Sequence, residues 1–365
     1  MGTSDNNERK KRESGYNSRG RFEQWTKNSS CEANVLSSVL GTPMDIPAKD
    51  LNLTPTRGQS PFAIARGRLF ERNLFKDNAV IFLNDLMKHD LIPDSSNCKF
   101  VDLRQKKDGG RCRNIDESMD KTHSLFKSLQ DTGENDIVVA GPVVKIPGSE
   151  ILLPEALLII DVLVVKKYPD TYECTIGEVK TYPDRSGYTD NGNLATARAQ
   201  AGMYVHALEC VIQELQVQDI LTVNKFGFLV LSKPGSLLPS IRVNEDLRYM
   251  AKRTRSGFEK LRKIADQFPQ TINDQSSSEL IQKADKNYRD DCLKFCDLAP
   301  HCREKAEEAG LPSILGHQME QYTHGLNLHD ILELIEEKRL PKNQAEEEFL
   351  QRYISSGGMG KAVSE

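Results

Sequence analysis

Residues 156–180 read ALLIIDVLVVKKYPDTYECTIGEVK, two apolar runs joined by a short polar segment that contains a Pro-Asp pair. Apolar runs of this length, separated by such a turn, are typical of two neighbouring strands joined as a hairpin. Because side chains alternate along a strand, Glu178 and Lys180 share one face while Val179 points to the other. Asp161 lies within the first run, so the hairpin carries an Asp and a Glu-x-Lys pair.

Asp161 is the more informative of these acids. Glu-x-Lys alone is common on the solvated edge of a sheet. A carboxylate within a run as apolar as residues 157–165 instead needs a partner, a metal ion or a raised pKa. Two acids for a divalent metal with an amine beside them indicate a nuclease.

Two further segments are predicted to be helices. Residues 60–75, SPFAIARGRLFERNLF, carry an imperfect helical apolar stripe with Pro61 in the first turn, and Glu71 could project from this helix towards the sheet. Residues 193–208, NLATARAQAGMYVHAL, are Ala-rich and helical by propensity. Gln200 and Tyr204 are four residues apart and share a helix face, where Gln200 can bind phosphate while Tyr204 stacks or donates.

Taken in order, four motifs resemble those of the RecB-like branch of the PD-(D/E)XK nucleases: Gly67-x-x-x-Glu71, Asp161, Glu178-x-Lys180 and Gln200-x-x-x-Tyr204. The resemblance covers about residues 60–240. It implies an α/β fold with a restriction-endonuclease-like core, in which helices flank a mixed central sheet. Many members of this branch carry His where this chain has Glu71. An all-oxygen ligand set suits Mg²⁺ or Mn²⁺.

The resemblance also implies a role for each matched residue. The metal ligands would be the side-chain carboxylates of Glu71, Asp161 and Glu178 and the backbone carbonyl of Val179. Lys180 would orient the attacking water or stabilise the transition state. Gln200 and Tyr204 would hold the DNA strand by its backbone.

The cysteines point to a second site. Three of the eight are close in sequence: Cys292, Cys296 and Cys302. The sequence shows neither a secretory signal nor an apolar run of membrane length, so we expect an intracellular protein with no membrane partner, where structural disulfides are rare. Clustered thiols there suggest zinc or an iron–sulfur cluster, which needs a fourth ligand.

The iron–sulfur subset of this branch, which includes CRISPR-associated and AddB-type nucleases, places one Cys before the core and three after it. Cys31 occupies the leading position here, which implies a 4Fe-4S cluster on Cys31, Cys292, Cys296 and Cys302. The Cys292-x3-Cys296 interval is one residue longer than the familiar spacing. Zinc is the alternative, with His301 able to replace one thiol. Either centre would join the two ends of the core, a constraint worth about 4 to 5 kcal/mol for a long loop.

The predicted organisation has four parts: a disordered basic tail over residues 1–25, a nuclease domain over 26–310, a helical appendage over 311–354 and a flexible end over 355–365. Within the domain, residues 94–135 are predicted to be a polar insertion with one helix near 119–130. Strands are predicted at 137–146, 156–166, 172–181, 226–231 and 240–243. Further helices are predicted at 61–90, 193–215, 245–267, 330–338 and 345–353.

A net charge of −4 does not favour nucleic acid, but basic clusters occur at residues 9–12, 104–113 and 252–263. We therefore expect a Mg²⁺- or Mn²⁺-dependent DNA nuclease, acting on single-stranded DNA or DNA ends in repair or defence. The chain contains no Gly-x-x-x-x-Gly-Lys-Ser/Thr motif, so a helicase partner would be another chain. Two alternatives stay open: a catalytically silent DNA-end-binding or scaffold subunit of a helicase-nuclease or defence complex, and a metal-stabilised interaction protein.

Overall fold

The computed structural model describes residues 24–25, 28–54, 61–104, 115–132, 135–148, 155–267, 276–289 and 292–356. These residues form two compact units: unit 1 holds the described residues within Gln59–Glu150 and Pro154–Lys263, and unit 2 those within Gly20–Gly58 and Ile264–Glu365. The predicted boundary near residue 310 falls inside unit 2. Three predicted features lie mostly outside the described residues: the tail over 1–25, of which 24–25 are described and helical, the basic cluster over 104–113, of which 104 is described, and the end over 355–365, of which 355–356 are described.

Unit 1 alternates helices and strands. Its elements are α5 (Pro61–Leu74), η1 (Lys76–Ala79), α6 (Val80–Lys88), β1 (Lys99–Asp102), α7 (Ile115–Thr132), β2 (Ile137–Ala140), β3 (Val143–Ile146), β4 (Ala156–Ile159), β5 (Val162–Lys167), β6 (Tyr172–Pro183), α8 (Asn191–Glu214), β7 (Leu221–Val223), β8 (Phe226–Ser232), β9 (Pro239–Asp246) and α9 (Arg248–Gln267). The last turn of α9 groups with unit 2.

The central sheet of unit 1 is open and mixed. Its order is β1-β2-β5-β6-β8-β9, and β7 pairs with β6 beside this path. β1 and β2 are parallel, and β5 is antiparallel to both of its neighbours, β2 and β6. β8 is parallel to β6, and β9 is antiparallel to β8. The predicted α/β class, with a mixed central sheet flanked by helices, is confirmed at this level.

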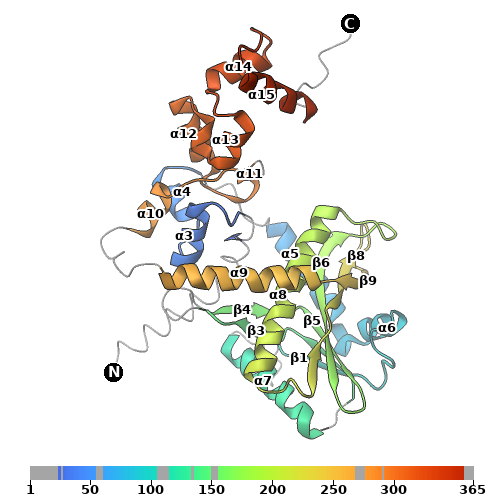
Figure 1. Ribbon diagram of the computed structural model, residues 1–365. Coiled ribbons are helices and arrows are strands. Elements are labelled where there is room, and N and C mark those ends of the chain that lie inside the picture. The colour runs from blue at the N-terminus through green and yellow to red at the C-terminus, as the bar shows by residue number, and fades with distance from the viewer. Residues whose placement is uncertain are drawn as a thin grey trace. The chain divides into compact units, whose positions relative to one another are not determined.

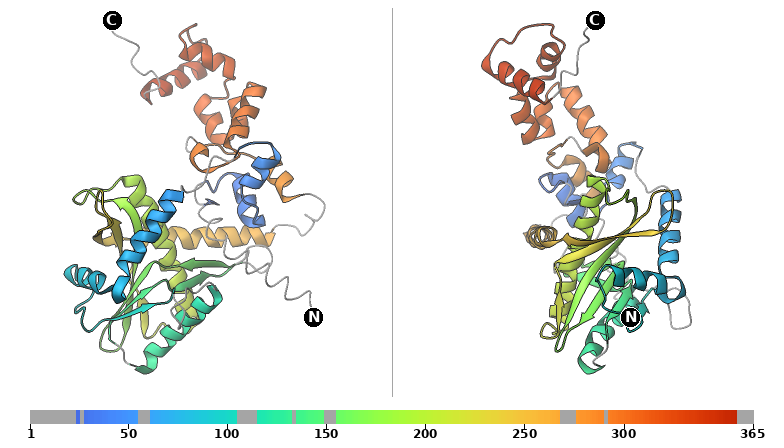
Figure 2. Two further views of the ribbon diagram at one scale, coloured as in Figure 1. Left: turned by 180° about the vertical axis from the view of Figure 1, so that it is seen from behind. Right: turned by 90° about the vertical axis from the view of Figure 1, so that its right-hand side faces the viewer.

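Helices pack on both faces of this sheet because the strands are apolar on both faces. On one face, α5 and α6 bury their apolar side chains against Val179, Phe228 and Val230. On the other face, Leu229 and Leu231 pack against the start of α8. In Figure 1 α8 lies in front of the sheet, and the rear view in Figure 2 shows α5 in front of it. Strands buried on both sides explain the long apolar runs of the sequence.

The predicted hairpin is confirmed: β5 and β6 are antiparallel, with Val162 opposite Gly177. Two of the predicted strands, however, are each interrupted. Gly141, at φ +70°, separates β2 from β3, and Ile160 and Asp161 separate β4 from β5. Beyond the break, β3 and β4 form a separate two-stranded sheet. Asp161 therefore lies at a strand break, a position where a polar side chain can leave the core.

The predicted insertion over residues 94–135 contains two elements of the fold. Its helix is α7, which covers the predicted residues 119–130. Residues 99–102 were expected to lie in a polar loop, but they form the edge strand β1. That expectation was wrong because a four-residue edge strand with Lys99 and Asp102 at its ends lacks the alternation that marks a longer strand.

Unit 2 is helical over its described residues. Its elements are α3 (Glu32–Leu40), α4 (Asp45–Asp50), α10 (Ser277–Lys283), α11 (Cys292–Phe295), α12 (Ala299–Ala309), η3 (Pro312–Leu315), α13 (His317–Thr323), α14 (Leu328–Ile335) and α15 (Gln344–Ser355). α14 and α15 correspond to the two predicted C-terminal helices. None of the described helices of either unit is long and apolar enough to cross a membrane.

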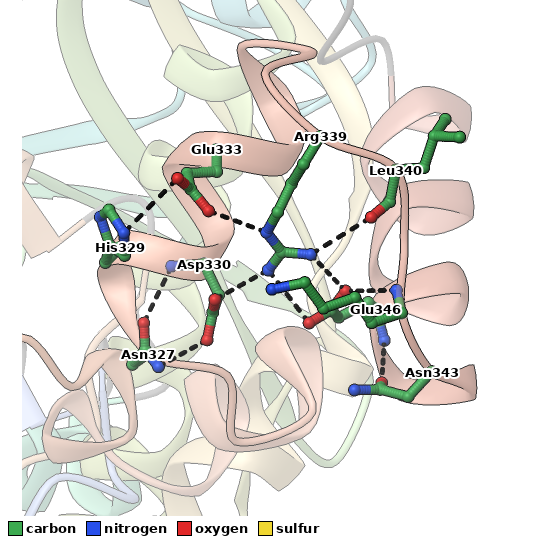
Figure 3. A network of polar contacts seen from close by, with 9 residues as sticks. Asn327, His329, Asp330, Glu333, Arg339, Leu340, Asn343 and Glu346 are labelled. Carbon is green, nitrogen blue, oxygen red and sulfur yellow. Dashed lines mark hydrogen bonds and ion pairs between the residues drawn. The ribbon is translucent and has the colours of Figure 1, made fainter.

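A polar network joins α14 to α15 within unit 2 (Figure 3). The Arg339 guanidinium, which is 13% exposed, pairs with Asp330 at 2.8 Å, Glu333 at 2.8 Å and Glu346 at 2.6 Å. Its Nη1 also donates to the Leu340 carbonyl. One cation thus pairs with carboxylates of both helices and fixes the two helices against each other.

Candidate functional site

Glu178 and Lys180 lie on β6 with their side chains on one face, and Val179 points into the core on the other. The Glu178 side chain is completely buried, whereas that of Lys180 is 23% exposed, and the Lys180 ammonium forms an ion pair with the Glu178 carboxylate. A fully buried carboxylate is unfavourable unless a cation accompanies it. Lys180 supplies one positive charge and still reaches solvent.

Asp161 is held beside this pair. One carboxylate oxygen of Asp161 (Oδ2) accepts a hydrogen bond from the Val179 N–H at 2.9 Å. Because Val162 is opposite Gly177, continuing the same antiparallel register places Asp161 opposite Glu178. The two predicted acidic ligands therefore come together, Glu178 from β6 and Asp161 from the break that precedes the adjacent strand β5.

Gly177 makes this arrangement possible. A Cβ atom added at Gly177 would lie 2.3 Å from the Phe228 ring of the neighbouring strand β8. The ring fills the space that a side chain would occupy, so only glycine allows β6 and β8 to pair at this point. Position 177 therefore requires glycine because of packing against Phe228 and not because of a role at the candidate site.

Glu71 lies on α5 and interacts with a residue that the sequence reasoning did not single out. Its Oε2 is 3.3 Å from the Arg104 guanidinium, and the two side chains are 43% and 29% exposed. Arg104 also pairs with Asp102 at 2.9 Å, and its guanidinium lies 4.3 Å from the centre of the Phe75 ring. These contacts hold the guanidinium in place and hold Glu71 against it.

Arg104 also connects Glu71 to the strand break. A Cβ atom at Gly141 would lie 2.2 Å from Cγ of Arg104, so the arginine passes directly over this glycine. The Gly141 N–H donates to the Asp161 carbonyl at 3.3 Å. Arg104 was predicted only as one member of a basic cluster. Its position at the end of β1 could not be found without the prediction of that strand.

The three carboxylates do not form a closed metal cage. Among the described residues, no three His, Cys, Asp or Glu side chains converge closely enough to hold one metal ion. The oxygen donors nevertheless have the chemistry of a hard-cation site: Asp161 and Glu178 are adjacent, and Glu178 is buried. Glu71 would have to leave Arg104 to complete a three-carboxylate set.

Gln200 and Tyr204 lie on α8, but not as expected. Tyr204 is completely buried and Gln200 is 8% exposed. Nε2 of Gln200 donates to the Tyr204 hydroxyl at 3.4 Å. A completely buried ring presents no face to a nucleic-acid base, so the role of Tyr204 in stacking or donating to a bound strand stays a prediction. The helical spacing placed both side chains on one face, as predicted, but that face points inwards.

In unit 2, four cysteines surround one small cavity of about 20 Å³: Cys31, Cys292, Cys296 and Cys302. Cys31 immediately precedes α3, Cys292 begins α11, and Cys302 lies in α12. All four side chains are buried. The structure thus brings together the four cysteines that the sequence singled out. His301 is not among the described residues that line the cavity.

The pKa of the Cys296 thiol is raised to about 12 and that of the Cys302 thiol to about 11. Burial is the largest cause of both shifts, and the neighbouring thiols of the group contribute to them. Lys286, which lines the same cavity, lowers the pKa of Cys302. A bound metal cation would favour the thiolate form of Cys296 and Cys302.

Two N–H groups point at the sulfur of Cys292. The backbone N–H of Arg289 donates to Sγ at 3.2 Å, and Nδ2 of Asn28 donates at 3.6 Å. Lys286 is oriented by hydrogen bonds from its ammonium to the carbonyls of Ile281 and Gln282. N–H donors and a nearby cation favour a negatively charged sulfur, which is the form that ligates a metal. Neither Asn28 nor Lys286 carries a sequence signal that could have identified it.

No protein-family model matches this chain, and no curated protein matches its sequence.

Proposed function

We propose that this protein is a metal-dependent DNA nuclease of the RecB-like PD-(D/E)XK type, with a restriction-endonuclease-like core in unit 1. The observation that carries the proposal is the buried Glu178 carboxylate, ion-paired with Lys180 on the same face of β6, with Asp161 beside it at the break that precedes β5. An edge-strand Glu-x-Lys would be solvated on both side chains. Here the pair is inside the molecule and only the amine reaches solvent.

Asp161 and Glu178 would hold a Mg²⁺ or Mn²⁺ ion, with the Val179 carbonyl and Glu71 as further ligands. When bound, the ion would activate water and neutralise charge on the scissile phosphate. The Val179 N–H engages one oxygen of Asp161 and thereby fixes which way the other points. The Lys180 ammonium is held by Glu178, so it is oriented before substrate arrives and can donate to the attacking water or to the phosphate.

Unit 2 would hold a 4Fe-4S cluster on Cys31, Cys292, Cys296 and Cys302. Four thiols lining one cavity are the number of ligands that such a cluster needs, and zinc is the alternative. The N–H donors at Cys292 and the cation of Lys286 suit an anionic cluster. Its role would be to join the segment around α3 to the segment around α11 and α12.

Cleavage of labelled single- and double-stranded DNA with Mg²⁺ or Mn²⁺ tests the enzyme. Wild type is expected to cleave, Lys180→Ala to lose activity, and Lys167→Ala, an exposed lysine at the far end of β5, to keep it. Equal activity in wild type and Lys180→Ala would show that the site is misassigned. Iron and acid-labile sulfide in anaerobically purified protein test the cluster, and stoichiometric zinc without iron would overturn it.

One observation favours the alternative of a silent DNA-end-binding or scaffold subunit. Glu71 is paired with Arg104 instead of turning towards Asp161 and Glu178. While Glu71 stays paired with Arg104, only Asp161 and Glu178 are placed to bind the metal ion. DNA binding by a wild-type protein that does not cleave with either metal would support the scaffold function.

A further inference from the structure

A short turn follows the strand that carries Glu178 and Lys180. In the segment Arg185–Tyr188 the Arg185 N–H donates to the Tyr188 carbonyl at 2.8 Å, and the Tyr188 N–H donates back at 3.1 Å. The two central residues, Ser186 and Gly187, both have positive φ, 54° and 89°. This is the pattern of a tight two-residue turn of the I′ class, which leaves little conformational freedom.

The turn is anchored at its base by Asp184, which is 5% exposed. One oxygen of Asp184 accepts from the Thr189 hydroxyl at 2.9 Å and the other from the Ser240 hydroxyl at 2.7 Å. The Asp184 N–H donates to the carbonyl of Ser232 at 2.8 Å. These bonds tie the turn to the ends of β8 and β9.

A second set of bonds ties the tip of the turn to α8. Arg242 donates to the Gly187 carbonyl at 2.7 Å and to Glu245 at 3.2 Å. Glu245 is 5% exposed and also accepts from Arg198 of α8 at 2.5 Å. Two buried carboxylates and two arginines therefore hold a surface turn in one conformation.

What this rigid turn presents to solvent is one aromatic ring and one cation. Tyr188 is 67% exposed, and Arg185 is exposed beside it. Arg66 reaches the base of the turn, where its guanidinium donates to the Ser232 hydroxyl at 3.4 Å. The exposed acid nearby, Asp190, caps α8 by accepting from the Asn193 N–H. Arg185 comes five positions after Lys180, which places their Cα atoms at most roughly 17 Å apart, a distance that a few nucleotides of extended single strand can span.

We propose that Tyr188 is a stacking platform for an unpaired nucleic-acid base, with Arg185 contacting the adjacent phosphate, so that the turn holds a single strand whose backbone passes Lys180. An exposed ring on a fixed backbone loses little entropy when a base stacks on it. A duplex keeps its bases stacked on one another and offers no free face to Tyr188. The inference rests on the proposed nuclease function and names its substrate as single-stranded.

Anisotropy of a labelled single-stranded oligonucleotide, in Ca²⁺ to prevent turnover, tests this platform. Tyr188→Ala is expected to raise Kd about tenfold, the usual effect of losing one stacked base, while Tyr188→Phe keeps wild-type affinity. Tyr249→Ala is the matched control, because Tyr249 on α9 is 69% exposed in the same unit but lies outside the turn. Binding of a blunt duplex should be the same in all four proteins.

In cleavage assays the Tyr188→Ala defect should appear in KM and not in kcat. Unchanged affinity of Tyr188→Ala for single strands, where wild type binds, overturns the platform and leaves the proposed function standing. Absence of single-strand binding by wild type overturns both. Equal melting temperatures of the variants would show that Tyr188 acts on the ligand and not on the fold.

Discussion

In unit 1 the candidate ligands stand on strands whose register is fixed by buried apolar pairs, whereas in unit 2 the candidate ligands are themselves part of the core. β5 and β6 are held together by pairing and by buried apolar side chains, among them Val162, Val164 and Val179. This packing does not depend on the charge or the metal binding of Asp161 and Glu178. Cys31, Cys292 and Cys296 instead belong to the cluster of buried side chains that joins α3 to α11. The first site should form without its metal, and the second should not be stable without its own.

The largest expected effect is a loss of cleavage activity without a loss of stability or of iron. Glu178→Gln removes the charge that holds Lys180 but keeps the shape, so we expect metal-dependent cleavage to fall by at least about 100-fold, as for loss of other oriented charged groups. Iron content and melting temperature should stay at wild-type values. A parallel loss of iron would show that the two units depend on each other and would contradict the comparison.

The next effect falls on unit 2. Cys296→Ala should lose iron and lower the free energy of unfolding by on the order of 4 kcal/mol, the value of a crosslink across a long loop. Cys174→Ala is the control, because Cys174 is buried in β6 of unit 1 and away from the cavity. Denaturant unfolding with iron analysis checks both. A Cys296→Ala protein as stable as wild type would mean that the cysteines do not hold unit 2 together.

A smaller change should sharpen the comparison within unit 1. Arg104→Gln frees Glu71 to approach Asp161 and Glu178, so the Mn²⁺ concentration for half-maximal cleavage should fall, by up to about fivefold for so exposed a pair. Arg104→Lys keeps the charge and should stay near wild type. A higher metal requirement in Arg104→Gln would instead show that Arg104 contributes to the site directly.

The smallest effect is a pH dependence at the turn. Burial raises the pKa of Asp184, but hydrogen bonds from Ser240 and Thr189 outweigh it, and the net pKa lies below the ordinary value. A lowered pKa in the folded state stabilises the fold above the unfolded value of about 3.9, and the contribution disappears as pH falls through the folded pKa. The stability difference between wild type and Asp184→Asn should therefore be constant from pH 7 to 5 and shrink below pH 4. A constant difference down to pH 3 would contradict this assignment.

Sequence periodicity predicted the parts of unit 1 that depend on local pattern. Alternation placed Glu178 and Lys180 on one face, and Ala-rich composition predicted α8. The break at Asp161 was missed, because its partner is a residue distant in sequence: the Asp161 carbonyl accepts from Gly141, which separates β2 from β3 at φ +70°. The inward turn of Tyr204 was also missed, because helical spacing shows which residues share a face but not where the face points.

Unit 2 was less accessible to such reasoning. Clustered cysteines suggested a centre, but spacing alone did not choose Cys31 as the fourth member; that came from a resemblance. The same holds for three residues that act through contacts with residues distant in sequence: Asn28 and Lys286 in unit 2 and Arg104 in unit 1. Nothing in the sequence around them indicates their role. Residues whose role depends on the tertiary structure are the ones that a single sequence conceals.

The contact between Gly177 and the Phe228 ring has a consequence for anyone who wishes to mutate the surroundings of Glu178. A library that randomises the neighbourhood of Glu178 would treat position 177 as free, yet every substitution there must displace a fully buried ring. Loss of activity at that position would then report collapse of the fold and be mistaken for catalytic importance. The shortest segment worth transplanting is therefore Gly177-Glu178-Val179-Lys180, supplied together with Phe228.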